Sequence, residues 1–180
     1  MLFEYYWYKQ VYTPEECDEI YQKSLENKIP GFNDIPGENK NVDCFGIPTA
    51  DFEQELDKFF RRIYYANNHS FGFDLYDLYM LDTCTVNVYS KGKSYGCHRD
   101  ATDLGSFSDI KLTAILNIST EKYTGGDFLF HFGTRKCLVT EIANPGDILI
   151  FPSFWYHEVT PVTSGNRISL SAWMKGPNWR

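Results

Sequence analysis

The amino-acid sequence predicts a mainly β fold with N-terminal helices, in which short strands build a jelly roll. Two helical patterns occupy the first part of the chain, and from about Leu78 onward short β-branched and aromatic runs alternate with Gly, Asn, Pro and Ser. Such runs are typical of a sandwich or barrel. The chain has 180 residues, 43% of them hydrophobic, which predicts one domain with residues 1–75 as helical support and 76–180 as the jelly-roll core.

The first helix is predicted to begin after Thr13 and to run to about Asn27. Threonine is a favourable helix cap, Pro14 suits the first helical position, and Glu16 is placed to complete a capping box. The stretch from Pro30 to Lys40 is rich in glycine, proline and asparagine, so it predicts an exposed loop that could lie over a cleft.

The second helix is predicted from an apolar stripe at helical spacing, formed by Phe52, Leu56, Phe59, Phe60 and Ile63. Both helices are expected to pack outside one sheet. The strands are then predicted at Thr83–Tyr89, Lys111–Ile118, Asp127–Phe132, Cys137–Ile142, Asp147–Phe151, Tyr156–Pro161 and Arg167–Met174.

Composition narrows the classes of function. A formal net charge of -7 argues against a nucleic-acid partner, and no segment is long enough to cross a bilayer or patterned as a secretory signal. The five cysteines are odd in number and widely spaced, which favours a reduced, cytoplasmic setting. Cys97 adjoins a histidine and could be a ligand or nucleophile, but we interpret it as a small, inert, buried residue.

A candidate metal site lies in the second half of the chain. His98 and Asp100 project to the same side of an extended segment, and His157 follows a turn and an apolar strand that could return it to them. On its own, the pair His98 and Asp100 is weak evidence for a metal site, because a His-Asp contact is more often an ordinary hydrogen-bonded pair. Two imidazoles and one carboxylate leave about three positions open on a metal, which suits a non-heme Fe(II) oxygenase, whereas a structural zinc site leaves none.

An anion site is predicted beside the metal. Arg167 and Ser169 share one strand face, so a charged fork and a hydroxyl could hold one carboxylate, and Tyr89 could add its phenol. The alternatives are a solvated arginine at a strand start and an ordinary strand tyrosine. With the metal ligands, the arginine indicates 2-oxoglutarate chemistry.

Other interpretations use the same residues. His131 could compete as the third ligand, but we interpret it as structural or adjacent to the metal, and His69 as loop surface. A non-redox, cupin-like isomerase or a small-molecule or sugar-binding jelly roll would share the architecture, but this sequence lacks the close H-x-H pair that marks that class. A zinc hydrolase would also need three ligands. Neither accounts for the arginine.

Three stretches carry a resemblance to a known family. Residues 89–100 resemble the first metal motif of prolyl 4-hydroxylase-like 2-oxoglutarate oxygenases, with both tyrosines, the glycine and the H-x-D in register. Residues 146–153 and 157–167 resemble the PKHD-type branch of that superfamily, and Tyr123–Asp127 resembles the glycine pair that begins its next strand. The similarity covers roughly residues 83–176.

The resemblance implies a double-stranded β-helix that binds Fe(II) through His98, Asp100 and His157. It also implies 2-oxoglutarate on Arg167 with help from Tyr89 and Ser169, with oxygen as co-substrate and ascorbate as an optional further cofactor. Hydroxylation of an aliphatic carbon, with release of succinate and carbon dioxide, is expected over halogenation, because related halogenases replace the carboxylate ligand.

The resemblance leaves the substrate open. Collagen-type prolyl hydroxylases carry lysine where Arg167 stands, so prolyl specificity does not transfer directly. A peptidyl proline leads by resemblance, ahead of a free amino acid, another small molecule or another protein side chain. The segments 31–47 and 101–109 are expected to border the entrance, and Phe151, Phe154, Trp155 and Trp173 are expected to form a water-excluding cage. No oligomeric state is predicted.

Overall fold

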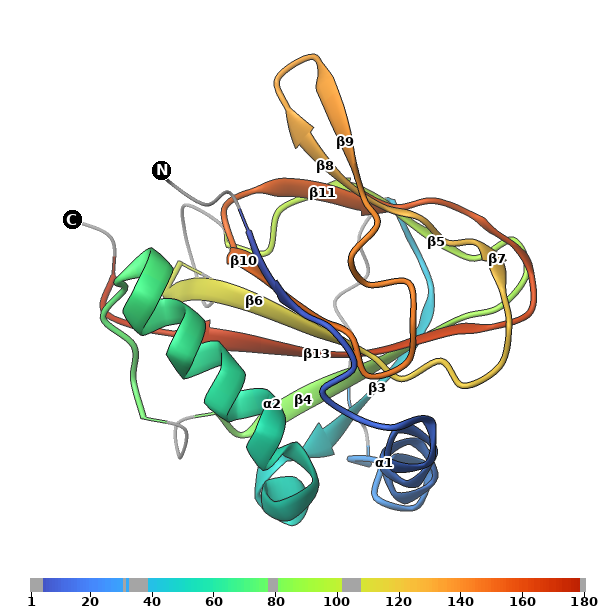
Figure 1. Cartoon of the computed structure of the whole chain (residues 1–180), viewed down its shortest axis with the longest axis horizontal. Helices are drawn as coiled ribbons and strands as arrows, with labels where there is room; N and C mark the ends of the chain where they lie inside the picture. Colours follow the sequence, from blue (N-terminus) through green and yellow to red (C-terminus); the bar gives the residue numbers. More distant parts are fainter. Residues whose placement is uncertain (1–4, 31, 33–38, 78–80, 102–107, 179–180) are drawn as a thin grey trace.

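The computed structural model describes residues 5–30, 32, 39–77, 81–101 and 108–178, and its two main antiparallel sheets face each other (Figure 1). The larger sheet has the strand order β1 (Tyr6–Tyr8), β10 (Ile148–Pro152), β6 (Ile110–Asn117), β13 (Arg167–Lys175), β4 (Thr83–Tyr89) and β3 (Asp43–Pro48). The smaller has the order β2 (Lys40–Asn41), β5 (Ser94–His98), β11 (Tyr156–Val159), β8 (Phe128–Phe132) and β9 (Arg135–Val139). A further pair joins β7 (Thr124–Gly125) to β12 (Val162–Ser164). The predicted jelly roll is confirmed.

Strand alternation divides the interior into two cores. Side chains of β13 at Leu170, Ala172 and Met174 pack in the core on the helix side of the larger sheet. The alternate residues of the same strand, Arg167, Ser169, Ser171 and Trp173, line a cavity between the sheets. All residues of β6 and β10 are buried, because the larger sheet is covered on both faces. The inner face is therefore where polar side chains can be held away from water.

The helices form as their local sequences predict. α1 spans Pro14–Glu26, and its predicted capping box is present: the backbone N–H of Glu16 donates to Thr13 Oγ1 at 3.2 Å, and that of Thr13 donates to Glu16 Oε2 at 2.9 Å. α2 spans Glu53–Ala66 between a 3-10 turn, Thr49–Phe52, and a π-helical turn, Asn67–Phe71. The predicted apolar stripe is fully or almost fully buried. Both helices lie outside the larger sheet, as expected (Figure 1).

Several short strands were not predicted. β1, β2, β3, β5, β7 and β12 lack a long periodic pattern and form by pairing with neighbours. The prediction of an entrance loop over 31–47 is partly wrong, because β2 and β3 occupy most of its second half. Residues 33–38 of this loop and 102–107 of the second predicted entrance loop lie outside the described residues. The first 75 residues thus supply β1 and β3 to the larger sheet and β2 to the smaller.

The cysteines depart from one prediction. No disulfide is formed within the described part of the chain, and Cys17 and Cys84 are fully buried, but Cys97 is exposed. The prediction that Cys97 is buried was wrong. Because its neighbour His98 faces the inside of the smaller sheet, alternation turns the Cys97 side chain outward.

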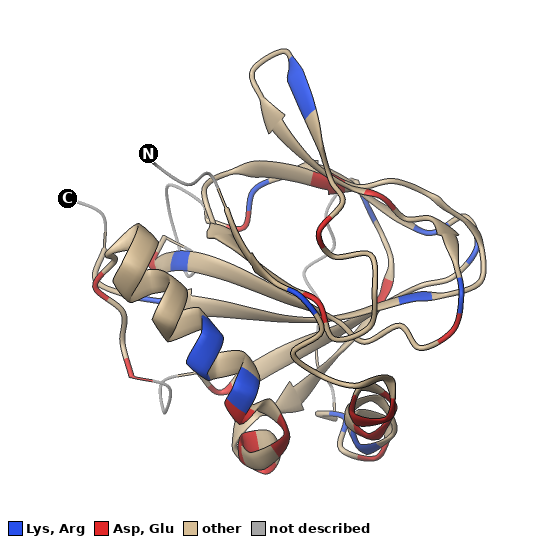
Figure 2. Cartoon of the chain, viewed as in Figure 1, with Lys and Arg blue, Asp and Glu red and all other residues tan. Residues whose placement is uncertain are grey.

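Charged side chains are found on both the helices and the strands (Figure 2). In Figure 2 acidic residues gather on α1 and at the start of α2, and basic residues are spread among helices and strands. Ion pairs of 2.7 Å between Lys23 and Glu55 and of 2.5 Å between Lys58 and Glu16 join the two helices. Within the described residues, no helix combines the length and apolarity that crossing a membrane would require.

Candidate metal centre and its cavity

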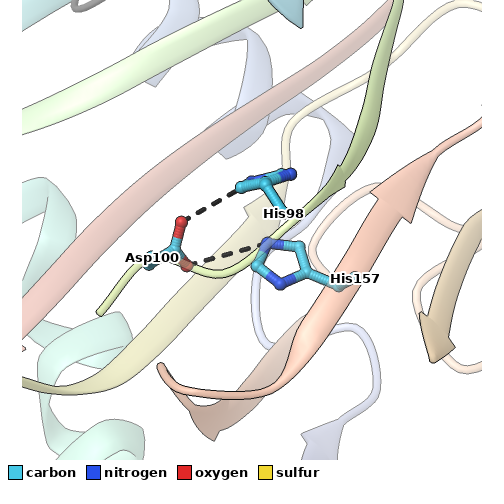
Figure 3. Close-up of side chains that lie close together, drawn as sticks. All are labelled: His98, Asp100 and His157. Atoms are coloured by element: carbon cyan, nitrogen blue, oxygen red, sulfur yellow. Dashed lines mark ion pairs between the residues drawn. The ribbon is translucent and has the colours of Figure 1, made fainter. Parts of the chain in front are cut away.

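Three predicted ligands meet between the two sheets. His98 is the last residue of β5, Asp100 lies two residues further on, and His157 lies on β11 directly opposite His98 in the antiparallel register. The Nε2 atoms of His98 and His157 lie 3.7 Å from Oδ1 and Oδ2 of Asp100, respectively (Figure 3). One ligand atom from each residue lies within 4.8 Å of the others. Strand pairing therefore brings together ligands that lie far apart in the sequence.

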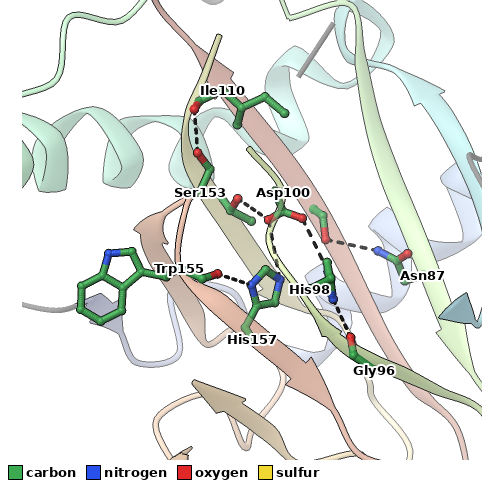
Figure 4. A network of polar contacts seen from close by, with 10 residues as sticks. Asn87, Gly96, His98, Asp100, Ile110, Ser153, Trp155 and His157 are labelled. Atoms are coloured by element: carbon green, nitrogen blue, oxygen red, sulfur yellow. Dashed lines mark hydrogen bonds and ion pairs between the residues drawn. The ribbon is translucent and has the colours of Figure 1, made fainter. Parts of the chain in front are cut away.

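Backbone carbonyls orient both imidazoles. His98 Nδ1 lies 2.8 Å from the carbonyl oxygen of Gly96, and His157 Nδ1 lies 2.9 Å from that of Trp155 (Figure 4). Because a carbonyl can only accept, each Nδ1 carries the proton in the neutral ring and each Nε2 keeps its lone pair. Both lone pairs are therefore available on the side of the carboxylate.

Electrostatics favour the metal-binding form of His98. Burial, and then the neighbouring His157 ring, lower the pKa of His98 from 6.5 to about 4, against the opposing influence of Asp100. At neutral pH this imidazole is uncharged, the form that ligates a metal. The side chains of His98, Asp100 and His157 are 18%, 10% and 5% exposed, so water has little access to the cluster.

The other histidines lie outside the cluster. His131 Nε2 is 3.1 Å from Glu158 Oε2, on the outward face of the smaller sheet. His69 is exposed and stacks on Tyr65 at 3.9 Å between ring centroids, in a π-helical turn and not in the predicted loop. Neither residue belongs to the ligand group found among the described residues.

Aromatic rings surround the imidazoles. Tyr95 stacks on His98 with ring centroids 3.5 Å apart, and Phe151 meets His157 edge to face at 4.9 Å. Of the residues predicted to form the cage, Phe151 is buried and Trp173 lines the cavity. Phe154 is 43% exposed, so the prediction was wrong for this residue. Trp155 contributes its backbone carbonyl to His157, and its ring packs elsewhere, against Phe130 and Phe132.

The predicted anion site lies in the same cavity. Arg167 is 2% exposed, its Nη1 donates to Ser169 Oγ at 3.3 Å, and its guanidinium carbon lies 5.2 Å from the centroid of the Tyr89 ring. Tyr89 faces Arg167 across the β4–β13 pair. The Nη2 atom is buried and has no hydrogen-bond partner among the described residues. A buried, unpartnered guanidinium nitrogen is a donor that a ligand carboxylate would satisfy.

A cavity of about 60 Å³ connects the two ends of the site. Its lining combines the three candidate ligands, the three candidate anion-binding residues and further residues that sequence reasoning did not single out for this site: Lys40, Asn87, Thr113, Ile115, Phe128, Val159 and Ser171. Thr113 could have been suspected, because it is a polar residue inside the otherwise apolar run Leu112–Leu116. Lys40 gives no such signal in the sequence.

Known proteins resemble this chain in sequence and in fold. Residues 84–175 match the 2OG-Fe(II) oxygenase superfamily. A PKHD-type hydroxylase of Idiomarina loihiensis is 34% identical over 103 residues, covering 53% of this chain and 45% of the relative. One of Alteromonas mediterranea is 32% identical over 96 residues, covering 49% and 41%. The chain therefore spans less than half the length of these curated relatives.

Solved structures share the fold at low sequence identity. A Pseudomonas putida prolyl-4-hydroxylase has a TM-score of 0.71 at 16% identity, covering 97% of this chain and 94% of that one. The viral collagen prolyl hydroxylase of Paramecium Bursaria Chlorella virus-1, in its 2OG complex, has 0.73 at 18%, covering 97% of both. A Trichoplax adhaerens prolyl hydroxylase in complex with a hypoxia inducible factor peptide fragment has 0.69 at 14%, covering 96% and 83%. Each likeness concerns the fold.

Proposed function

The chain belongs to the 2OG-Fe(II) oxygenase superfamily, and we propose that it is a 2-oxoglutarate-dependent dioxygenase that hydroxylates an aliphatic carbon. One observation carries the proposal: the cavity that holds His98, Asp100 and His157 also holds the unpartnered Nη2 of Arg167. A metal site alone would also suit a zinc hydrolase, but that reaction gives no function to a buried guanidinium at the cavity wall.

In this proposal each residue has a defined task. His98, Asp100 and His157 hold Fe(II) through two imidazole nitrogens and a carboxylate, which is the donor set of non-heme oxygenases. Arg167 binds the carboxylate of 2-oxoglutarate that lies away from the metal, with Ser169 and Tyr89 beside it. When bound, the iron supplies the oxidation that couples decarboxylation of 2-oxoglutarate to hydroxylation, with release of succinate and carbon dioxide.

The protein itself orients and shields the reactants. The carbonyls of Gly96 and Trp155 fix the tautomers of the two histidines, and Phe151 packs against His157. The buried rings exclude water from the side of the cavity where substrate carbon would react. A carboxylate ligand at position 100 also favours hydroxylation, because it occupies the position that a halide would need.

A peptidyl proline is the first substrate class that we propose. It is supported by the fold shared with prolyl hydroxylases, one of which was solved with a peptide fragment. Free amino acids and other small molecules are the next candidates. A panel of prolyl peptides, other peptides and free amino acids, assayed for substrate-dependent succinate release, will rank them.

The metal and co-substrate roles have a direct test. Anaerobic Fe(II) plus 2-oxoglutarate should give the wild-type protein a weak metal-to-ligand charge-transfer band, and Asp100→Ala and His157→Ala should abolish both this band and succinate formation. His131→Ala is the matched control, because that imidazole lies on the same sheet outside the cluster. Thermal unfolding of each variant checks folding. A wild-type protein without the band, or an Asp100→Ala variant with normal turnover, would refute the proposal.

A further inference from the structure

Thr113 makes a close contact with the candidate ligand Asp100. It lies on β6, between Phe151 on β10 and Trp173 on β13, and is 2% exposed. Its hydroxyl donates to Asp100 Oδ2 at 2.5 Å. Among the described residues, this is the side-chain hydrogen bond that Asp100 receives, and its carboxylate also lies 3.7 Å from the Nε2 atom of each imidazole (Figure 3).

The backbone of Asp100 is linked to β6 through Ser153, the residue that follows β10. The N–H groups of Asp100 and Ala101 donate to the carbonyl oxygen of Ser153 at 3.0 and 3.1 Å. Ser153 is in turn held by β6, because its N–H donates to Lys111 O at 3.0 Å and its hydroxyl donates to Ile110 O at 2.6 Å (Figure 4). Since β6 thus holds both the backbone and the side chain of Asp100, the carboxylate has little freedom to turn.

The two carboxylate oxygens are therefore chemically unequal. Each oxygen lies 3.7 Å from one imidazole Nε2, Oδ1 from that of His98 and Oδ2 from that of His157. Oδ2 also receives the hydroxyl proton of Thr113, whereas Oδ1 accepts no hydrogen bond among the described residues. A hydrogen bond from a neutral donor to a charged acceptor is stronger than one between neutral groups, so Oδ2 is held by the protein and Oδ1 remains the better free donor.

We infer that Thr113 is a positioning residue that makes Asp100 bind the metal through one oxygen and so preserves an open coordination position. Two imidazoles and one carboxylate oxygen leave three positions of an octahedral ion open, and a second carboxylate oxygen would occupy one of them. The inference rests on the proposed metal centre. It assigns to the hydroxyl of Thr113 a role that its methyl group and its packing do not share.

Co(II) binding to the protein freed of metal tests the inference without requiring turnover. Thr113→Val keeps the shape and removes the hydroxyl, and should weaken Co(II) binding by about 10–100-fold, the range found when partners of metal ligands are removed. Thr113→Ser keeps the hydroxyl and should bind Co(II) within about threefold of wild type. Thr49→Val is the matched control, because this buried threonine contacts Cys84 away from the cavity and should affect folding stability alone.

The number of open positions has its own measurement. In the Mn(II) protein, EPR line broadening by ¹⁷O-labelled water counts metal-bound waters, and Thr113→Val should hold one fewer than wild type and Thr113→Ser. If Thr113→Val does not unfold cooperatively, Thr113→Ala replaces it. Unchanged affinity and water count in the variant without a hydroxyl would overturn the inference, as would an equal loss in Thr113→Ser. Absence of Co(II) binding by the wild type would instead overturn the metal centre itself.

Discussion

Arg167→Met is the substitution that best separates a ligand-binding role from a structural one. Methionine keeps an apolar stem of similar length and removes the guanidinium. In the free protein, Arg167 already has one satisfied nitrogen, which donates to Ser169, and one buried nitrogen without a partner. Removing the side chain should therefore weaken 2-oxoglutarate binding severely while changing the stability of the free protein little.

The two effects differ in size. Removing one partner of a buried charge pair costs about 3–5 kcal/mol, and about 1.4 kcal/mol corresponds to tenfold in Kd, so we expect Kd for 2-oxoglutarate to rise by roughly two to three and a half orders of magnitude. In the free protein, relief of the unsatisfied nitrogen is worth about 1–3 kcal/mol and offsets loss of the Ser169 hydrogen bond and the Tyr89 contact. The unfolding free energy should stay within about 1 kcal/mol of wild type.

Thermal and denaturant unfolding with Mn(II), with and without 2-oxoglutarate, measures both quantities. At a ligand concentration of about 100 times the wild-type Kd, the wild type should gain about 2.7 kcal/mol and a variant with 100-fold weaker binding about 0.4 kcal/mol. Arg135→Met, at an exposed position of β9, is the control and should behave as wild type. Binding by Arg167→Met within threefold of wild type, or a large loss of stability without ligand, would contradict the reasoning.

Three further changes have defined outcomes. Gly126→Ala places a Cβ 3.0 Å from Arg167 Cδ at a φ of +67°, whereas Gly133→Ala has a similar φ of +62° and open space. Both should lose about 1–2 kcal/mol of stability from backbone strain, and only Gly126→Ala should weaken 2-oxoglutarate binding, as isothermal titration would show. Between pH 6.5 and 4 the unfolded chain protonates position 98 and the native metal-free protein does not, because the native pKa of His98 is lowered to about 4. Its unfolding free energy should therefore fall with decreasing pH by up to roughly 3 kcal/mol, and a His98→Gln variant with the same pH dependence would contradict this. Thr13→Ala removes the helix cap and should cost about 1 kcal/mol, seen as a Tm lower by about 2–4 °C, with Thr13→Ser close to wild type.

The features that were predictable from the sequence are those with local causes. Thr13 and Glu16 lie close enough along the chain to cap α1 without help from the rest of the fold, and the apolar stripe of α2 has helical spacing whatever it packs against. β4 likewise carries enough β-branched residues to be predicted with its observed bounds, Thr83–Tyr89. The candidate ligands and Arg167 could also be proposed from the sequence, because their chemistry belongs to the residues themselves.

What the sequence by itself determined is therefore the helices, the longer strands and the chemical identity of the donors. The tertiary structure alone decided that His157 pairs opposite His98, that Thr113 reaches Asp100 from another sheet, and that short strands such as β2 close the side of the cavity. The physical reason is that these contacts join residues far apart in the chain. Their free energy comes from strand register and shared burial, which no local pattern specifies.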